Sequence, residues 1–185
     1  IPGTSILVDS FYKAVSEKGC VYVLSHFHGD HYGRLSERWD APVHCSQVTG
    51  RLLVNVLGVR EDLVRAHGLA EPFELPGVDH MEFLQAEHCP GAVMILARTS
   101  REQQWHLHTG DFRATPRLLA VVRERRLPKV QTLFLDSTYA LAKRSFPDQS
   151  EVVQRIVDDL ADTPATTLIL VAAYSVGKER VILRL

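Results

Sequence analysis

The sequence predicts a mixed α/β fold in which layered β-sheets are covered by helices. Short apolar runs rich in β-branched residues alternate along the chain with amphipathic runs of helical period. The 185 residues are 45% hydrophobic and 23% charged, fractions close to the average of soluble globular domains. No apolar run approaches the roughly 20 residues that span a bilayer, since Leu168–Ala173 and Ala92–Ala97 are each six residues long. These observations favour stacked sheets with helices outside them and predict no transmembrane helix.

Eight apolar runs bounded by turn residues are predicted to be strands, because they are short and rich in β-branched side chains. In chain order they are Ser5–Val8, Val21–Ser25, Pro42–Cys45, Met81–Ala86, Ala92–Ala97, Trp105–His108, Thr132–Leu135 and Thr167–Ala173. The segment Glu71–Gly77 between two of these runs is expected to be a linker.

Six runs are predicted to be helices from the spacing of their apolar residues. In chain order they are His31–Arg38, Ser46–Leu57, Glu61–His67, Pro116–Arg126, Ser150–Asp162 and Val176–Leu185. Pro116 is well placed in the first turn of its helix, with Thr115 as the N-cap. In Ser150–Asp162 the apolar residues fall on one stripe.

Acidic and histidine side chains fall where predicted strands end. The residues that follow a predicted strand directly or within three positions are Asp9, His26, Asp111 and Asp136. Loops at one edge of a rigid sheet are where catalytic groups usually collect. We therefore expect a functional site at a sheet edge.

Net charge does not point to a nucleic-acid or membrane partner when the chain is taken as a whole. The 21 Lys and Arg residues nearly balance the 22 Asp and Glu residues, which leaves a formal charge of -1. The stretch from Arg98 to Arg144, however, carries ten basic and four acidic residues, so its charge is +6 and that of the remainder is -7. Such a stretch is expected to position nucleic-acid strands through their phosphates rather than to read bases. A solvated helix face is the alternative interpretation.

The three cysteines, Cys20, Cys45 and Cys89, are scattered and form no Cys-x-x-Cys pair. This argues against a disulfide framework or a zinc finger, and an intracellular, reducing compartment is expected. The chain begins at Ile1 without a charged-then-apolar leader, so no signal peptide is visible and the segment is expected to be cut from a longer chain.

The most specific segment reads His-x-His-x-Asp-His and places four potential metal ligands within six residues. In an extended loop His26 and His28 point the same way, while Asp30 and His31 can turn toward a second ion. Gly29 gives the backbone room to bend between the two pairs. A single histidine is usually a satisfied core or surface residue, but this pattern between an apolar run and a helix predicts a metal site.

Two later positions can complete a site for two ions. His88 and Asp111 each lie in a glycine-containing turn between predicted strands, although ordinary turn chemistry is an alternative for either. Cys89 could be proposed as a thiolate ligand, but Pro90 and Gly91 shape the turn and the neighbour of a ligand usually points elsewhere. Surface or packing roles are expected for the remaining histidines, His44, His67, His80, His106 and His108. One of the last two could lie near the site, because their strand leads to Asp111.

The order of these ligands resembles the metallo-β-lactamase superfamily, whose αββα sandwich carries one or two metals along the sheet edge. Longer matches narrow the resemblance to the β-CASP group and, within it, to the DNA cross-link repair branch, the nucleases related to Artemis and Apollo. The matching segments are Ile1–Thr4, Val8–Asp9, Leu24–His31, Glu87–Met94, Leu107–Arg113, Leu135–Tyr139 and Tyr174–Glu179. They extend from the first residues almost to the last.

The resemblance implies a ligand set. The first metal is expected on His26, His28, His88 and Asp111, and the second on Asp30, His31 and the bridging Asp111. Asp9 is expected to hydrogen-bond to the ligand loop rather than to bind metal. Zinc suits these ligands best, with manganese or iron as alternatives. In the family the metals supply hydroxide by lowering the pKa of bound water, and paired ions hold the attacking and leaving oxygens.

Asp136 matches the first acid of the β-CASP motifs, which in the family orients a histidine that protonates the leaving oxygen. That histidine lies beyond the position of Leu185 in family members, and a helix cap is the alternative interpretation of Asp136. Residues 1–173 are expected to be the N-terminal part of the metallo-β-lactamase domain and residues 174–185 the start of a truncated β-CASP region. The sandwich is thus expected to be incomplete. The catalytic carboxylates are expected to be Asp9, Asp30, Asp111 and Asp136.

The family implies a nuclear, metal-dependent DNA repair nuclease. It would be a 5'-to-3' exodeoxyribonuclease acting on single-stranded or damaged ends that carry a 5'-phosphate, in interstrand cross-link repair or double-strand break repair. Two alternatives stay open, an RNA-processing β-CASP nuclease and a DNA-repair scaffold that is catalytically silent because the chain is truncated.

Three further residues are candidates for holding substrate phosphates. Ser175 and Lys178 lie in a small-residue turn that is expected to open a helix and could offer N–H groups and a cation to one phosphate. A Walker A loop is rejected because Ala172 stands where glycine is required. A simple N-cap is the alternative for Ser175. Arg113 follows the ligand Asp111 and could face the substrate backbone.

Overall fold

The computed structural model describes residues 1–11, 19–141, 143 and 145–185. They form two compact units, residues 1–136 and residues 137–185. Arg144, the last residue of the predicted basic stretch, lies outside the described residues. The predicted boundary between residues 173 and 174 stays a prediction. Within the described ranges, no helix combines the length and apolar character needed to cross a membrane.

A sheet of four parallel strands forms one half of the first unit. Its order is β1-β2-β3-β4, with β1 at Ile6–Val8, β2 at Val21–Val23, β3 at Val43–Ser46 and β4 at Val64–His67. The register pairs Val8 with Val23, and Ser46 with His67. Because parallel strands run in one direction, their carboxyl ends meet at one sheet edge. The segments that follow β1 and β2 therefore emerge side by side.

A second sheet of five strands forms the other half. Its order is β5-β6-β7-β8-β9, with β5 at Phe73–Leu75, β6 at Val78–Gln85, β7 at Val93–Thr99, β8 at Trp105–His108 and β9 at Val130–Phe134. All its neighbours pair antiparallel except β8 and β9, which are parallel. Helix α3, Pro116–Glu124, connects these two parallel strands, as a parallel connection requires.

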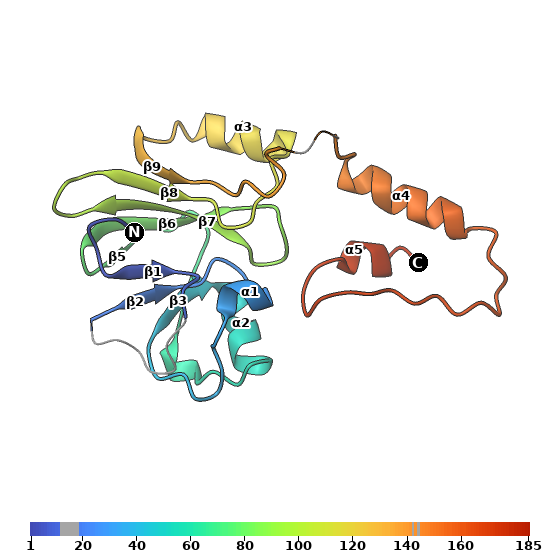
Figure 1. The fold of residues 1–185 in the computed structure, drawn as a ribbon, viewed down its shortest axis with the longest axis horizontal. Helices are drawn as coiled ribbons and strands as arrows, with labels where there is room; N and C mark the ends of the chain where they lie inside the picture. Colours follow the sequence, from blue (N-terminus) through green and yellow to red (C-terminus); the bar gives the residue numbers. More distant parts are fainter. Residues whose placement is uncertain (12–18, 142, 144) are drawn as a thin grey trace. The chain divides into compact units, whose positions relative to one another are not determined.

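The two sheets pack face to face through a buried core. Ile6 and Val23 of the parallel sheet meet Met81, Phe83 and Ile95 of the second sheet. Helix α2, Gln47–Asn55, covers the outer face of the parallel sheet, and α3 covers the outer face of the other (Figure 1). The layers run helix, sheet, sheet, helix. This confirms the predicted αββα sandwich.

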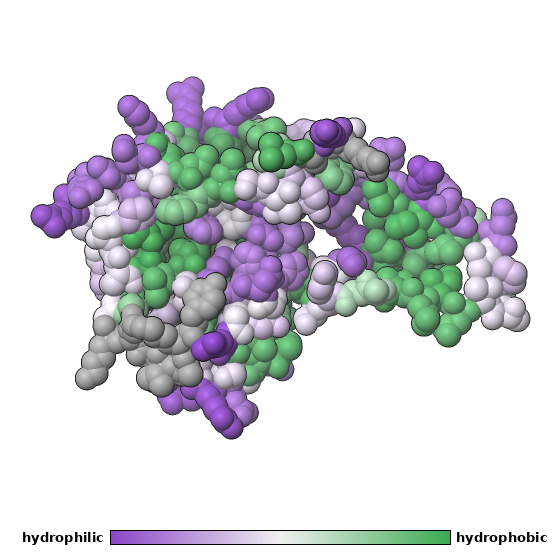
Figure 2. Space-filling model, in the orientation of Figure 1, coloured by the Kyte–Doolittle hydropathy of each residue, from purple (hydrophilic) through white to green (hydrophobic). Residues whose placement is uncertain are grey.

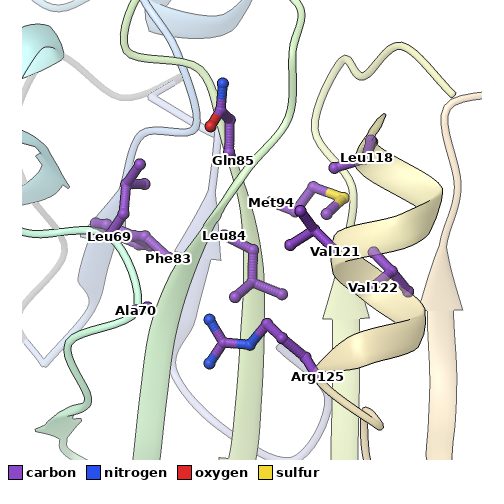
Figure 3. A pocket seen from close by; sticks show the side chains of 10 residues that line it. All are labelled: Leu69, Ala70, Phe83, Leu84, Gln85, Met94, Leu118, Val121, Val122 and Arg125. Atoms are coloured by element: carbon purple, nitrogen blue, oxygen red, sulfur yellow. The ribbon is translucent and has the colours of Figure 1, made fainter. Parts of the chain in front are cut away.

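Helix α3 begins as predicted, with Thr115 as its N-cap and Pro116 in the first turn. The Thr115 hydroxyl accepts a hydrogen bond from the Leu118 amide at 3.0 Å. Beside the helix an apolar cleft of about 180 Å³ remains over β6 and β7. Figure 3 shows Leu118, Val121 and Val122 facing this cleft from the helix. Arg125 lies at one end of it, where it pairs with the buried Glu82.

Two segments adopt a structure other than the one predicted. Glu61–His67, predicted as a helix, forms a short 3-10 turn at Glu61–Leu63 and then strand β4. A helix of seven residues is too short to be stable alone, whereas β4 pairs with β3 over four residues. Glu71–Gly77, predicted as a linker, contains β5, whose Phe73 pairs with Met81. For the other strands and helices predicted in this unit, the observed ends lie within three residues of the predicted ends, with one helix as the exception.

That helix is the one predicted at His31–Arg38. The structure instead has a single turn of helix, α1, at Gly29–Tyr32. Gly33 ends it with a positive φ of 47°, a conformation that stops a helix readily at glycine. The histidine-rich loop, residues 26–31, is thus helical in its second half and extended in its first.

The described residues of the second unit, residues 137–185, form two helices. Helix α4, Gln149–Leu160, agrees with the prediction, but α5 is only Glu179–Ile182, because Lys178 at a φ of 65° interrupts the helix predicted at Val176–Leu185. Thr167–Ala173, predicted as a strand, pairs with no strand among the described residues. Its Leu168 and Leu170 are 81% and 83% exposed. Figure 2 shows hydrophobic residues on the surface of this unit.

Candidate metal centre

The histidine-rich loop, residues 26–31, lies at the carboxyl edge of the parallel sheet. Asp9 follows β1 and its amide donates to the Val23 carbonyl at 3.0 Å, which holds the two strand ends together. His28 precedes α1, and its carbonyl accepts from the amides of His31 and Tyr32 at 2.9 and 3.0 Å. These backbone bonds fix the turn. They direct ligands from both halves of the loop toward the same edge.

Three imidazoles and one carboxylate converge beside this loop. The ligand atoms of His26, His28, His88 and Asp111 all lie within 4.8 Å of one another. The His28 Nδ1 atom is 3.0 Å from His26 Nε2 and 3.1 Å from His88 Nε2. His88 is contributed by the turn between β6 and β7, and Asp111 by the segment after β8. Residues far apart in sequence are therefore brought together as a metal-competent group.

Asp111 faces the histidines with both carboxylate oxygens. Its Oδ2 atom lies 3.8 Å from His26 Nε2 and 3.6 Å from His88 Nε2. Its Oδ1 atom lies 3.2 Å from His31 Nε2. One carboxylate therefore addresses both halves of the loop. This is the placement that a bridging ligand needs.

Asp9 orients His26 and His31 through their Nδ1 atoms, on the side of each ring away from the cluster. Its Oδ1 accepts from the Ser25 amide at 2.7 Å, and its Oδ2 accepts from the Ser25 hydroxyl at 2.6 Å and from His31 Nδ1 at 2.8 Å. Because the hydroxyl gives its only proton to Asp9, it accepts from His26 Nδ1, 2.9 Å away. Both rings thus carry their proton on Nδ1. Their Nε2 lone pairs are left facing the cluster, as in other metal sites whose histidines bond to a carboxylate.

The electrostatics of the cluster suit a bound cation. Burial, with the neighbouring His31, His28 and His88, lowers the pKa of His26 to about 2, so its imidazole is neutral, the form that binds metal. Burial also lowers the pKa of His31, but its hydrogen bond to Asp9 and the charges of Asp9, Asp111 and Asp30 outweigh burial and raise it overall. A positive charge is therefore favoured between His31 Nε2 and Asp111. In the absence of metal this charge is a proton on His31 Nε2, and a metal ion can take its place. The residues present therefore fit a metal.

Asp30 lies at the outer margin of the cluster. Its side chain is 81% exposed, and its Oδ2 atom is 3.7 Å from His31 Nε2. Asp30 is in neither of the two metal-competent groups found among the described residues, the second of which joins Asp9, His26 and His31. The structure thus brings Asp30 next to His31 without placing it among the converging atoms.

Asp136 follows β9 and lies behind the Asp111 turn. Its backbone amide donates to the Thr109 hydroxyl at 2.9 Å, and its Oδ2 atom accepts from the Phe112 amide at 3.4 Å. Phe112 is the residue after Asp111. The carboxyl group of Asp136 therefore lies against the segment that carries Asp111.

The histidines expected to have packing or surface roles differ in their surroundings. His44 and His67 join through Nδ1 and Nε2 at 2.9 Å, and His67 stacks on Phe73 with ring centroids 3.6 Å apart. His106 is 2% exposed, and neither of its ring nitrogens has a hydrogen-bond partner among the described residues. His80 packs edge-on to Trp105. Cys89 is in neither metal-competent group formed by the described residues and packs against the core under α3.

The candidate phosphate-binding residues are spread over both units. Arg113 lies two residues after Asp111, and its amide donates to the Ala86 carbonyl at 3.0 Å. Ser175 is exposed and does not cap the short α5, whose N-cap position is held by Lys178. The Glu179 carboxylate accepts from the Gly177 amide at 2.6 Å, so that N–H is already used. The Lys178 ammonium donates to the Ala172 carbonyl at 3.1 Å.

Several cations of the predicted basic stretch are paired within the first unit. Arg98 bonds to Asp79 at 2.8 Å, Arg125 to Glu82 at 2.7 Å, and Arg117 lies 3.5 Å from Glu87. Such pairing reduces the positive charge that these residues present to solvent. The formal charge of +6 for residues 98–144 therefore overstates the positive electrostatic potential at the surface of this unit.

Sequence reasoning did not identify Ser25, and it expected a surface or packing role for His108, with a place near the site as the alternative. Ser25 connects Asp9 to His26, as described above. The His108 Nδ1 atom accepts from the Gly110 amide at 3.0 Å, directly before Asp111. Serine is common in loops, so only its place before the first histidine of the motif could have drawn attention to it. For His108 the signal was its place at the end of the strand leading to Asp111.

Comparisons with known proteins agree with this geometry, although no family model matches the chain. The chain is 40% identical over 183 residues to the DNA cross-link repair protein pso2/snm1 of Schizosaccharomyces pombe, covering 94% of this chain and 32% of that protein. It is 32% identical over 199 residues to the 5' exonuclease Apollo of Danio rerio, covering 100% of this chain and 33% of that protein. The chain spans about a third of the length of these two relatives.

Among solved structures, the chain is similar to a protein of unknown function from Enterococcus faecalis V583. The TM-score is 0.54 at 18% identity, and the match covers 84% of this chain and 42% of that one. This likeness concerns the fold alone.

An αββα sandwich with a His and Asp cluster at the sheet edge defines an incomplete fold of the metallo-β-lactamase type. Within that class, the chain is similar over nearly its whole length to proteins of the DNA cross-link repair branch of the metallo-β-lactamase/β-CASP superfamily.

Proposed function

We propose that this chain is the metal-binding part of a DNA repair nuclease that hydrolyses phosphodiester bonds from a 5' end. The observation that carries the proposal is the convergence of ligand atoms of His26, His28, His88 and Asp111 within 4.8 Å of one another, with His31 Nε2 lying 3.2 Å from Asp111 Oδ1. The names of the relatives supply the substrate class, because they include DNA cross-link repair proteins and a 5' exonuclease. The activity belongs to the whole protein, of which residues 1–173 contribute the first part of the metallo-β-lactamase domain and residues 174–185 the start of the β-CASP region.

The ligand set favours zinc at one or two positions. His26, His28, His88 and Asp111 would hold one ion, and His31, Asp111 and Asp30 would hold the other. Imidazole and carboxylate donors suit zinc best, with manganese or iron as alternatives. Bound metal would supply a hydroxide nucleophile near neutral pH by lowering the pKa of a coordinated water, and would stabilise charge on the phosphate.

The other residues of the site orient ligands and substrate. Asp9 holds the rings of His26 and His31 with their Nε2 atoms toward the cluster, through the contacts at 2.6 to 2.9 Å described above. Asp136 is proposed to orient a histidine that protonates the leaving oxygen. Its position against Phe112 supports this role, because it places the carboxyl group beside the segment that carries Asp111.

DNA contacts are proposed for Arg113, Ser175 and Lys178. Arg113 is supported by its place two residues after Asp111, and its side chain is half-buried. Exposed cations of the basic stretch that lie outside the pairs given above, such as Arg123 and Lys129, would add affinity that depends on salt rather than on sequence. Nuclear localisation, action on damaged ends, and roles in interstrand cross-link repair and double-strand break repair are proposed from the family resemblance, and the names of the relatives support DNA cross-link repair.

The proposal is tested by nuclease assays on the intact protein with 5'-phosphorylated single strands of DNA and RNA of the same sequence. Wild-type protein is expected to shorten the DNA strand from its 5' end. Asp30→Ala is expected to abolish this activity, and the exposed, paired Asp62 provides a control in Asp62→Ala, which should cleave normally.

Other outcomes would redirect the proposal. Faster cleavage of RNA would favour an RNA-processing nuclease, and metal binding without cleavage of either strand would favour a silent scaffold. Full activity of Asp30→Ala with unchanged metal content would overturn the proposed mechanism.

A further inference from the structure

The turn that presents Asp111 is held by an unusual acceptor, the imidazole of His108. His108 is the last residue of β8, and its Nδ1 atom accepts a hydrogen bond from the Gly110 amide at 3.0 Å. Because an N–H donates to it, this nitrogen carries no proton. The ring is therefore fixed as the tautomer protonated on Nε2.

The backbone around this bond has little room to move. Gly110 has a φ of 53°, and a Cβ atom there would lie 3.0 Å from the Cβ and Oγ atoms of Ser25 and 3.2 Å from the Val93 carbonyl oxygen. Ser25 is the residue that connects Asp9 to His26. The Asp111 turn is thus packed directly against the residue that orients the first ligand of the loop.

The ring of His108 is itself held in place. It stacks on Phe134 of β9, with ring centroids 5.4 Å apart and planes inclined by 26°. Between His108 and Gly110, the Thr109 amide donates to the Phe134 carbonyl at 2.9 Å and the Thr109 hydroxyl donates to the Gly110 carbonyl at 2.8 Å. These contacts hold the ring so that the lone pair of Nδ1 points toward the Gly110 amide.

We propose that His108 is a positioning residue for the metal centre. Its Nδ1 atom fixes the Gly110 peptide and so directs the carboxylate of Asp111 between the two halves of the histidine-rich loop. This inference rests on the proposed metal centre. It assigns a role to a histidine that is neither a ligand nor part of the Asp9 and Ser25 contacts.

Two substitutions separate the acceptor from the ring. His108→Asn keeps an acceptor close to the place of Nδ1 but loses the stacked ring, whereas His108→Phe keeps the ring but loses the acceptor. His106→Phe is the matched control, because His106 is on the same strand and its ring nitrogens have no partner among the described residues. His108→Gln moves the acceptor one carbon further out and provides a second comparison with His108→Asn if His108→Phe fails to fold.

Zinc affinity of the intact protein is measured by competition with a chromophoric chelator, and the absorption spectrum of the cobalt-substituted protein reports ligand geometry. We expect His108→Phe and His108→Gln to bind zinc at least about tenfold more weakly, as is common when a group that orients a ligand is lost. We expect His108→Asn and His106→Phe to bind within about threefold of wild type, and the cobalt spectrum to change only in the first pair. That pattern supports the proposal.

Wild-type affinity in His108→Phe, or an equal loss in His108→Asn and His108→Phe, would overturn the role of His108 alone. Wild-type protein that binds no zinc would instead overturn the proposed metal centre. Circular dichroism of each variant shows that it is folded before its affinity is compared.

Discussion

Replacing Asp9 by Asn tests how the histidine-rich loop is held. Asp9 has a φ of 51°, a left-handed conformation that Asn also adopts readily, so this substitution leaves the backbone unstrained. Its carboxylate accepts three hydrogen bonds, from the Ser25 amide, the Ser25 hydroxyl and His31. In either amide orientation, the NH2 group of Asn would face at least one of these donors. The charge and one or two of the bonds are lost.

The size of the effect follows from these contacts. The Asp9 side chain is only 10% exposed, and hydrogen bonds to charged groups contribute about 1.5–3 kcal/mol each. Because the Ser25 hydroxyl can rotate toward another acceptor, we expect a loss of roughly 2–4 kcal/mol in the free energy of unfolding. We also expect zinc to bind about 10–100-fold more weakly, because the rings of His26 and His31 lose their orientation.

The assay is urea unfolding of metal-free protein, followed by zinc competition on the folded protein. Asp62→Asn is the control, since Asp62 belongs to an exposed ion pair whose loss is expected to leave the free energy of unfolding nearly unchanged. An Asp9→Asn variant that matches wild type in both zinc affinity and unfolding free energy would refute the argument.

Two further predictions concern stability. Gly110→Ala is expected to lower the free energy of unfolding by about 1–3 kcal/mol, because residue 110 has a positive φ and a Cβ atom there would approach Ser25 and Val93 closely. Gly77 also has a positive φ, but a Cβ atom there would meet only Thr4, at 3.4 Å. Thermal unfolding should therefore show a smaller loss of stability for Gly77→Ala than for Gly110→Ala. Burial, with the charges of His67 and Arg65, lowers the pKa of His44 from 6.5 to about 4. The unfolded chain therefore binds a proton at His44 before the folded chain does, and the free energy of unfolding should fall as the pH drops from 6.5 toward 4, by roughly 2 kcal/mol after allowance for partial exposure. Metal-free His44→Gln should show a flatter pH dependence over the same range, and an identical slope would contradict the prediction.

The residues singled out from the sequence include four that the structure brings together, whereas several local conformations were predicted wrongly. His26, His28, Asp30 and His31 are adjacent in sequence, so their spacing alone indicates a metal-binding loop. His88 and Asp111 lie in separate turns of the second sheet, and only the order of motifs in the family pointed to them. The structure brings these two residues to the loop because both sheets contribute to the same edge.

Local periodicity failed where tertiary pairing decides the conformation. Val64–His67 has too few residues to distinguish a helix from a strand, and pairing with β3 makes it a strand. Thr167–Ala173 has the composition of a strand, but a strand also needs a hydrogen-bonding neighbour, and composition does not supply one. Ser25 and His108 were not assigned for a related reason. Their roles arise from hydrogen bonds to residues whose positions depend on the fold.

The central claim is that the side chains of His26, His28, His88, His31 and Asp111 form a centre that holds one or two metal ions. The most direct measurement is the zinc, manganese and iron content of the purified intact protein, by elemental analysis, for wild type and Asp111→Ala. Because Asp111 faces both halves of the loop, wild type is predicted to hold one or two ions per chain and Asp111→Ala to hold less metal than wild type. A wild-type protein without bound metal, or an Asp111→Ala variant with the same metal content as wild type, would contradict the claim.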